Sequence, residues 1–390
     1  MLLAAVSIKK GVETMIPHCP HLPPCDGCPR FAESGIAAEP YERLRALAER
    51  AQCELPAPVE GNSVGYRMRA RLAVRGTTTE PKIGLFQERS HNIVDIPRCV
   101  IHHPLVNQAA SQVKLALRET QTPPYHDRLH SGLVRYLQVV VERSTRTVQL
   151  ALICNAETPE SVAGLFDSLD ARLGDQAHSL WFNGNTAKHN VILGPHWQRW
   201  SGPEAVVESI GGARVFYPPD AFGQANLDLF EHAVTRIHQF VPDGARVVEY
   251  HAGVGAIGLG LLRRARSLDC VELAAGGLRG LELGALELSE AQRARLTIHA
   301  GASAAHVGLL ADADVVIVDP PRKGLEAALT QGLLQTPPAK LAYLSCGLDS
   351  FLRDVEALLA SGRWRLSALE PYAFFPFTQH VETLALLERR

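Results

Sequence analysis

Residues 247–259 read VVEYHAGVGAIGL and decide the fold of the second half of the chain. A short apolar run containing one acid is followed by a turn with three glycines, Gly253, Gly255 and Gly258, and by further apolar residues. This order predicts a buried strand, a tight turn and an apolar helix whose N–H groups point at a ligand. A doubly wound fold without a nucleotide uses the same connection, so this stretch alone does not identify the ligand.

The same alternation continues from Pro242 to the C-terminus. Apolar runs alternate with segments whose apolar residues recur at helical spacing, such as 350–360. Such strands and helices are typical of an α/β fold with a parallel sheet covered on both faces. The last run follows residues 364–369 closely, which predicts an antiparallel strand at that edge. The apolar runs span residues 247–250, 270–273, 296–299, 315–319, 341–345 and 381–387.

The first half of the chain has a different pattern. Residues 66–75, 135–141 and 147–153 are runs of β-branched and apolar residues separated by polar turns, as in antiparallel strands. Before them, residues 41–53 carry apolar side chains at helical spacing and then meet two prolines, which predicts a helix that ends there. We expect an N-terminal cysteine-bearing segment with a helix (1–58), a β-rich central domain (59–205) and an α/β domain (206–390).

The composition is that of a globular protein without a strong charge. Of the 390 residues, 46% are hydrophobic and 21% charged, which excludes disorder and coiled coils. The net charge of −2 means that no overall basic field indicates a nucleic-acid partner. The apolar residues 2–6 precede the first lysines, the reverse of a secretory signal, and no run approaches the roughly 18 residues of a membrane span. We expect a cytoplasmic protein without membrane contact.

The basic residues are nevertheless unevenly distributed. All but seven of the 39 are arginine, whose planar guanidinium suits phosphates and stacked bases. Arg67, Arg69, Arg71 and Arg75 occupy odd-numbered positions of one expected strand, and alternation puts them on one face. This arginine strip is either a local RNA-binding surface or a solvated strand face.

Two features narrow the class of cofactor. Glu272 lies at the end of the strand after the glycine-rich turn, where an acid accepts hydrogen bonds from a ribose diol, as NAD or S-adenosylmethionine requires. The later strand ends carry Asp319-Pro320-Pro321-Arg322 and Ser345-Cys346-Gly347, a pair for which a dehydrogenase has no evident use. The consecutive prolines hold the loop after Asp319 extended, so its carboxylate can accept from the edge of a base.

These residues resemble the S-adenosylmethionine-dependent RNA uracil-5-methyltransferases, in particular the branch that carries an iron–sulfur cluster. The resemblance spans nearly the whole chain. It implies a Rossmann-like class I methyltransferase domain with a mostly parallel seven-stranded sheet over residues 206–390, preceded by a β-rich, cluster-bearing domain. Five motifs occur in the family's order: 221–226 (AFGQAN), 252–255 (AGVG), 319–324 (DPPRKG), 345–346 (SC) and 375–382 (FPFTQHVE).

The resemblance implies a role for each motif. In the family, a cysteine thiolate adds to C6 of uracil, C5 then attacks the sulfonium methyl, and a base removes the C5 proton before the thiolate leaves. By match, Cys346 is the nucleophile and Glu382 the base. The expected substrate-binding residues are Gln224, Asp319 and Arg322. The residues expected to contact S-adenosylmethionine are Gln224, Tyr250, Gly253, Gly255, Glu272 and Asp319.

Three of the eight cysteines lie close together near the N-terminus. Cys19, Cys25 and Cys28 offer three thiolates, and a closed four-cysteine site needs one more ligand. The spacing fits zinc and a [4Fe–4S] cluster equally. The resemblance favours the [4Fe–4S] cluster and implies Cys99 as the fourth ligand. Because the reaction has no step for a cluster, we expect it to serve folding or RNA positioning.

Three positions depart from the family's pattern. His251-Ala252 stands where an aromatic residue and a cysteine usually precede Gly253, and Gly347 replaces an asparagine beside the nucleophile. Ala302 stands where an aspartate usually accepts from the adenine amino group, and the lost hydrogen bond is worth roughly 1 kcal/mol. The change at Ala302 predicts weaker cofactor binding.

The resemblance implies a monomeric enzyme that methylates C5 of a specific uridine in structured RNA. Ribosomal RNA, 23S rRNA in particular, is favoured over transfer RNA, because members that have the cluster and lack an extra N-terminal barrel mostly act there. Two other functions stay open. One is an amino-group methyltransferase of the D-P-P type; the other is an RNA-binding cluster protein that has lost catalysis, which Ala302 and Gly347 motivate.

Overall fold

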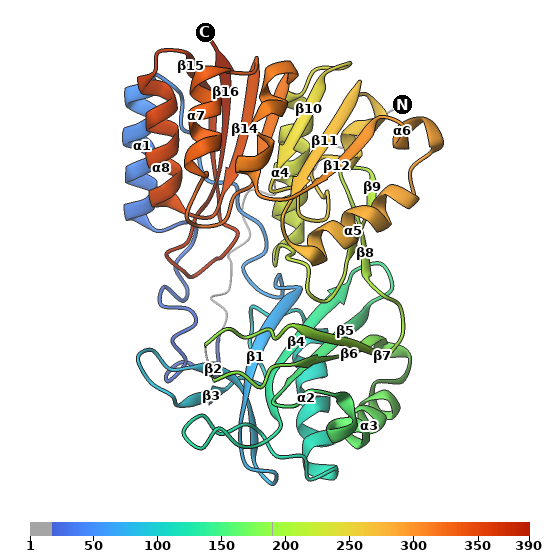
Figure 1. The fold of residues 1–390 in the computed structure, drawn as a ribbon. Coiled ribbons are helices and arrows are strands. Elements are labelled where there is room, and N and C mark those ends of the chain that lie inside the picture. The colour runs from blue at the N-terminus through green and yellow to red at the C-terminus, as the bar shows by residue number, and fades with distance from the viewer. Residues whose placement is uncertain (1–17, 189) are drawn as a thin grey trace, which may run out of the picture.

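Two seven-stranded sheets form the protein, one in each half of the chain (Figure 1). The computed structural model describes residues 18–188 and 190–390. The N-terminal sheet has the order β3-β2-β1-β4-β5-β6-β7, the C-terminal sheet the order β12-β11-β10-β13-β14-β16-β15, and β8 and β9 pair separately. The strands are β1 (Arg69–Gly76), β2 (Pro81–Phe86), β3 (Ile93–Asp95), β4 (Val134–Glu142), β5 (Thr147–Cys154), β6 (Ala177–Gly184), β7 (His196–Ser201), β8 (Val206–Ile210), β9 (Ala213–Tyr217), β10 (Arg246–Tyr250), β11 (Ser267–Glu272), β12 (Leu296–Ala300), β13 (Val315–Val318), β14 (Lys340–Ser345), β15 (Trp364–Tyr372) and β16 (Glu382–Arg389).

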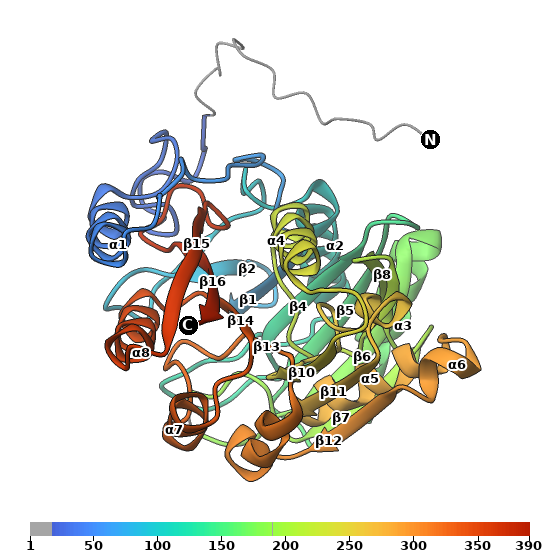
Figure 2. The same cartoon turned by 90° about the horizontal axis from the view of Figure 1, so that it is seen from above.

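Helices cover both sheets (Figure 2). Among the described residues, no helix is long and apolar enough to cross a membrane. The α-helices are α1 (Ala38–Ala51), α2 (Pro104–Glu119), α3 (Ala163–Leu173), α4 (Leu227–Phe240), α5 (Ala275–Leu286), α6 (Glu290–Arg293), α7 (Ala327–Gln335) and α8 (Leu348–Ala360), and the 3₁₀ helices are η1 (Pro159–Val162), η2 (Gly174–Gln176), η3 (Leu259–Arg263) and η4 (Ser303–Asp312).

The C-terminal sheet confirms the α/β, Rossmann-like class. It is parallel from β12 to β14, whereas β16 runs antiparallel to both of its neighbours, β14 and the edge strand β15. β10 lies between β11 and β13, so the strand order reverses at β10. One face packs against α4, η3 and α5, and the other against α1, α7 and α8. Figure 1 shows α1 beside α8, so the helix expected at 41–53 forms part of the core of the C-terminal sheet.

The N-terminal sheet is antiparallel except for the pair β5 and β6. Two helices that the sequence reasoning did not predict, α2 and α3, pack against it around one apolar core. The buried residues Val106, Ala109, Ala110 and Val113 of α2 do follow the helical period. The expected strands are thus present, but the central region is an α+β layer rather than strands alone.

The prediction of an apolar helix directly after the glycine-rich turn is wrong. The chain makes turns after β10 and then only the short 3₁₀ helix η3. Gly258 lies directly on β10, because a Cβ there would come within 2.2 Å of Glu249 Oε2. Repeated glycine has low helix propensity and permits this close approach, so the segment follows the sheet instead of continuing as a regular helix.

The arginine strip is not one continuous free surface. Arg75 is 7% exposed and pairs with Asp127 at 2.6 Å. Arg69 Nη1 donates to the Ala221 carbonyl at 2.5 Å and so connects the N-terminal sheet to the C-terminal half. Arg71, which is exposed, donates to Gln138 at 2.6 Å. These arginines therefore serve contacts within the protein.

Candidate active site

A pocket of about 730 Å³ opens where the strand order of the C-terminal sheet reverses. Ligands of open α/β sheets bind at this place, outside the carboxyl ends of the strands, and the volume suits a nucleoside cofactor. Loops after β10, β11, β12, β13 and β14 form its wall, together with the loop before α4. The predicted site residues that line it are Gln224, Gly253, Glu272, Asp319, Arg322 and Cys346.

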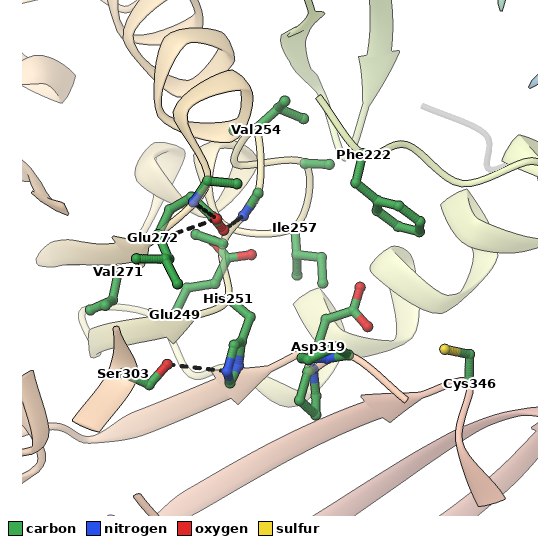
Figure 3. Close-up of a pocket in the computed structure, with 18 of the residues that line it drawn as sticks. Phe222, Glu249, His251, Val254, Ile257, Val271, Glu272, Ser303, Asp319 and Cys346 are labelled. Atoms are coloured by element: carbon green, nitrogen blue, oxygen red, sulfur yellow. Dashed lines mark hydrogen bonds between the residues drawn. The ribbon is translucent and has the colours of Figure 1, made fainter. Parts of the chain in front are cut away.

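The Glu272 carboxylate organises the glycine-rich turn. It accepts from the backbone N–H groups of Gly253 at 2.7 Å, Leu273 at 2.9 Å and Ala274 at 2.6 Å (Figure 3). Gly253 has φ +55°, which favours glycine, and a Cβ there would meet no atom within 4 Å. A hydrogen-bond acceptor therefore lies in the pocket wall beside an open stretch of backbone, as a ribose diol requires.

Two residues predicted to contact the cofactor lie outside the pocket wall. The Tyr250 side chain is fully buried on the opposite face of the sheet, and its hydroxyl donates to the His306 carbonyl at 3.0 Å. Side chains alternate along a strand, so Glu249 faces the pocket instead. Gly255 has φ +77° and leaves no room for a Cβ, which would lie 2.3 Å from Leu281. Gly255 therefore allows the turn to pack against Leu281 and does not line the pocket.

Cys346 and Asp319 line one end of the pocket, and Glu382 is fully buried beside Cys346, outside the pocket lining. Cys346 follows β14, Asp319 follows β13, and Glu382 begins β16, the strand beside β14. Figure 3 shows Cys346 and Phe222 on one side of the cavity and Glu272, His251 and Ser303 on the other. The strand ends bring the predicted nucleophile and carboxylates together.

Burial and mutual repulsion control the charges at this end. Burial raises the pKa of Asp319 to about 7, and burial together with Asp319 raises the pKa of Glu382 well above its ordinary value. Both Glu382 carboxylate oxygens lack a hydrogen-bond partner within the described part of the chain. Burial and then the carboxylates of Glu382 and Asp319 raise the pKa of the Cys346 thiol to about 11, and Arg322 opposes this shift. These shifts favour the protonated form of all three groups.

Several pocket residues were not predicted from the sequence as site residues. Glu249 is fully buried below the turn, and burial raises its pKa to about 8. Phe222, 71% exposed, and Phe375 line the pocket and offer aromatic faces near Cys346. At the other end, His251 Nε2 lies 3.1 Å from Ser303 Oγ, next to Ala302. Glu249 could have been found as an acid within an apolar strand, and Phe222 and Phe375 as aromatic residues within two of the motifs.

The four N-terminal-domain cysteines lie around a second cavity. Cys19, Cys25, Cys28 and Cys99 all carry free thiols and line a space of about 160 Å³ below β1. Within the described ranges, no three His, Cys, Asp or Glu side chains are close enough to hold a metal ion. The structure thus brings the predicted ligands to one cavity without showing a metal site.

Comparison with known proteins identifies relatives along the whole chain. The family model for tRNA (uracil-5-)-methyltransferases matches residues 305–390. An uncharacterized RNA methyltransferase of Protochlamydia amoebophila is 36% identical over 95% of this chain and 97% of its own length. One from Geobacter sulfurreducens is 30% identical over 96% of this chain and 77% of its own.

A solved structure shares the fold. The crystal structure of Pyrococcus abyssi tRNA (uracil-54, C5)-methyltransferase in complex with S-adenosyl-L-homocysteine superposes with a TM-score of 0.73 at 22% identity, covering 88% of this chain and 81% of that one. The ordered motifs, the pocket at the point where the strand order reverses, and relatives matched from end to end agree with one another. The chain belongs to the S-adenosylmethionine-dependent RNA uracil-5-methyltransferase family.

Proposed function

We propose that this protein transfers a methyl group from S-adenosylmethionine to C5 of a specific uridine in structured RNA, through a covalent bond between Cys346 and C6. The observation that carries the proposal is the placement of Cys346 and Asp319 at one end of a pocket large enough for a nucleoside cofactor, with the buried Glu382 carboxyl beside Cys346. The amino-group methyltransferase has no use for a cysteine in this position, so the structure favours uridine C5.

The two ends of the pocket suit the two halves of the cofactor. Glu272 and the open backbone at Gly253 would bind the ribose, and the exposed side chain of Leu273 would cover one face of the adenine. S-adenosylmethionine, when bound, supplies an electrophilic methyl group. Gln224, which also lines the pocket, would hold the pyrimidine or the methionyl group.

Each step of the reaction falls to a residue of this chain. The Cys346 thiolate forms a bond to C6, which makes C5 nucleophilic toward the methyl group. Glu382 then takes the proton from C5, and the C6–S bond breaks to regenerate the thiolate. Asp319 would accept from the uracil edge. Arg322 opposes the rise in the pKa of Cys346 and so favours the reactive thiolate.

A mechanism-based substrate tests the proposal. RNA in which 5-fluorouridine replaces uridine has no C5 proton for Glu382 to remove, so a methylated adduct with Cys346 should accumulate. We expect a protein–RNA band that survives denaturing electrophoresis and needs S-adenosylmethionine. Absence of this band with the wild type, or its persistence with Cys346→Ala, would contradict the mechanism. RNA binding without S-adenosylmethionine binding would instead support a protein that has lost catalysis.

We propose 23S rRNA as the target, because the resemblance is to cluster-bearing members that act on it. The relative from Pyrococcus abyssi acts on uracil 54 of tRNA, which makes tRNA the alternative. Nucleoside mass spectrometry on rRNA and tRNA from a strain without the gene separates the two. Loss of 5-methyluridine from rRNA supports the proposal, and loss confined to tRNA overturns this choice.

We also propose that Cys19, Cys25, Cys28 and Cys99 hold a [4Fe–4S] cluster. Four free thiols facing one cavity are the donor set that such a cluster uses. Iron with acid-labile sulfide is the expected content of the purified protein. Stoichiometric zinc without sulfide would overturn the cluster.

A further inference from the structure

The segment that follows Cys28 packs against the loop that leads to Glu382. This β15–β16 loop comprises residues 373–381. The backbone N–H of Arg30 donates to the Phe377 carbonyl at 3.0 Å, and Arg30 Nη1 donates to the Thr378 carbonyl at 3.1 Å. One residue of the cysteine-bearing segment therefore holds two consecutive carbonyls of the loop.

Arg30 is itself fixed within its segment. It is 9% exposed, its Nε donates to Glu33 at 2.8 Å, and its Nη2 donates to the Ile36 carbonyl at 3.3 Å. A guanidinium whose donors are arranged in this way is a rigid connection, because its planar fork fixes several hydrogen-bond directions at once. The segment 28–36 thus presents a defined surface to the loop.

Phe377 provides the apolar part of the same contact. Its ring centre lies 5.0 Å from that of Phe31, and it belongs to a buried cluster with Cys28, Tyr66 and Ile101. Phe377 has φ +67°, in the left-handed region that residues other than glycine rarely adopt. Such a conformation persists where the surroundings impose it, and here the cysteine-bearing segment supplies these surroundings.

The other side of the loop faces the pocket. Phe375 lines the pocket wall together with Cys346. The guanidinium carbon of Arg67 lies 5.7 Å from the centre of the Phe375 ring, and Arg67 also lines the cavity between the cysteines. Asn226 Nδ2 donates to the Phe374 carbonyl at 3.2 Å. The loop is therefore held at residue 374 from the C-terminal half and at residues 377 and 378 from the cysteine-bearing segment.

We propose that the segment 28–36 sets the conformation of the β15–β16 loop, with Arg30 as the positioning residue, so that Phe375 forms the wall against which the target base lies. The cysteine site then acts on catalysis through packing, without a chemical step. The consequence for the reaction rests on the proposed function. The contact between the two segments does not.

The test replaces Arg30 in the full-length protein and follows the loop directly. In Arg30→Ala, hydrogen–deuterium exchange of a peptide covering 373–381 should become faster than in the wild type. The kcat for RNA methylation should fall on the order of 10- to 100-fold, because a wall displaced by about 1 Å misplaces the base. The Kd for S-adenosylhomocysteine should stay unchanged. Arg43→Ala is the matched control, since Arg43 is a surface residue of α1 that pairs with Glu39 and Asp349, and it should change none of these values.

Two results would overturn the inference. One is unchanged exchange of the loop in Arg30→Ala, and the other is faster exchange with unchanged kcat. If Arg30→Ala does not fold, Arg30→Lys and Phe31→Leu keep part of each contact and should show intermediate exchange and kcat. A wild type that methylates no RNA contradicts the proposed function, and the exchange measurement still decides whether Arg30 holds the loop.

Discussion

The pocket and the cysteine cavity are built in different ways. Each reactive group lies within two residues of the end or beginning of a strand. Asp319 and Cys346 follow the parallel strands β13 and β14, and because β16 is antiparallel to β14, its first residue, Glu382, lies at the same edge of the sheet. The cysteine cavity is formed by loop residues 19–28 and by Cys99, and it depends on packing against β1. The pocket should therefore keep its cofactor half without the cysteine site, whereas the loop beside Cys346 should not keep its shape.

The largest effect is expected from Cys346→Ala. Without the thiolate, C5 is not activated, and methylation should fall by at least about 10³-fold, as for other nucleophile deletions. The adduct with 5-fluorouridine RNA should disappear, whereas iron content and S-adenosylhomocysteine binding should match the wild type. Cys53→Ala is the control, because Cys53 is a half-buried thiol that lines neither cavity. A variant that loses its iron with Cys346 would show that the two regions are not separable.

Glu382→Gln should block a later step. An amide cannot take the C5 proton, so turnover should drop by about 10²- to 10³-fold while the methylated adduct accumulates on unmodified RNA. Release of tritium from RNA labelled at uridine C5 measures this step. Glu388→Gln at the other end of β16 is the matched control. Equal tritium release by both variants would remove Glu382 from the role of base.

The sequence predicted the pocket far better than its surroundings. Asp319 and Cys346 were identifiable because each follows an apolar strand within a motif. The sequence could not show whether Glu249 or Tyr250 faces the pocket. Both lie in a strand that is buried on its two faces, and the pattern does not distinguish these faces. Arg30 carries no sequence signal for its role, because its contact with residue 377 joins positions more than 340 apart and arises only in the folded chain.

Cys28→Ser should disrupt the cysteine site and leave cofactor binding in the pocket intact. Serine does not provide a thiolate, so iron and acid-labile sulfide should be lost. S-adenosylhomocysteine should still bind with the wild-type Kd, because Glu272 and Gly253 receive no contact from the cysteine site. Methylation should decrease by about tenfold or more, as expected when support of a site is lost. Cys53→Ser is the control. Loss of cofactor binding in Cys28→Ser would show that the pocket needs the cysteine site.

The smallest effect on the reaction, and a distinct one on stability, is expected from Glu249→Gln. Glu249 is 2% exposed, and burial raises its pKa to about 8, above its ordinary 4.5. Between these values the unfolded chain has released the proton that the folded chain keeps, so folding stability falls as pH rises from about 4.5 to 8, by an amount on the order of 5 kcal/mol for this group. Glutamine has no proton to lose, so urea unfolding of the variant should depend less on pH.

The pH dependence of stability that remains in Glu249→Gln reports on the other buried carboxyl groups. Asp319 and Glu382 also have raised pKa values, so they should still lower the stability as pH rises, whereas Glu60→Gln, an exposed control, should leave the wild-type slope unchanged. Parallel slopes for Glu249→Gln and the wild type would mean that Glu249 is solvated in the folded protein. A smaller dependence of stability on pH in Glu249→Gln would show that a carboxyl buried at these strand ends makes the folded protein less stable as the pH rises. The same cost would then apply to Asp319 and Glu382, which must ionise to act.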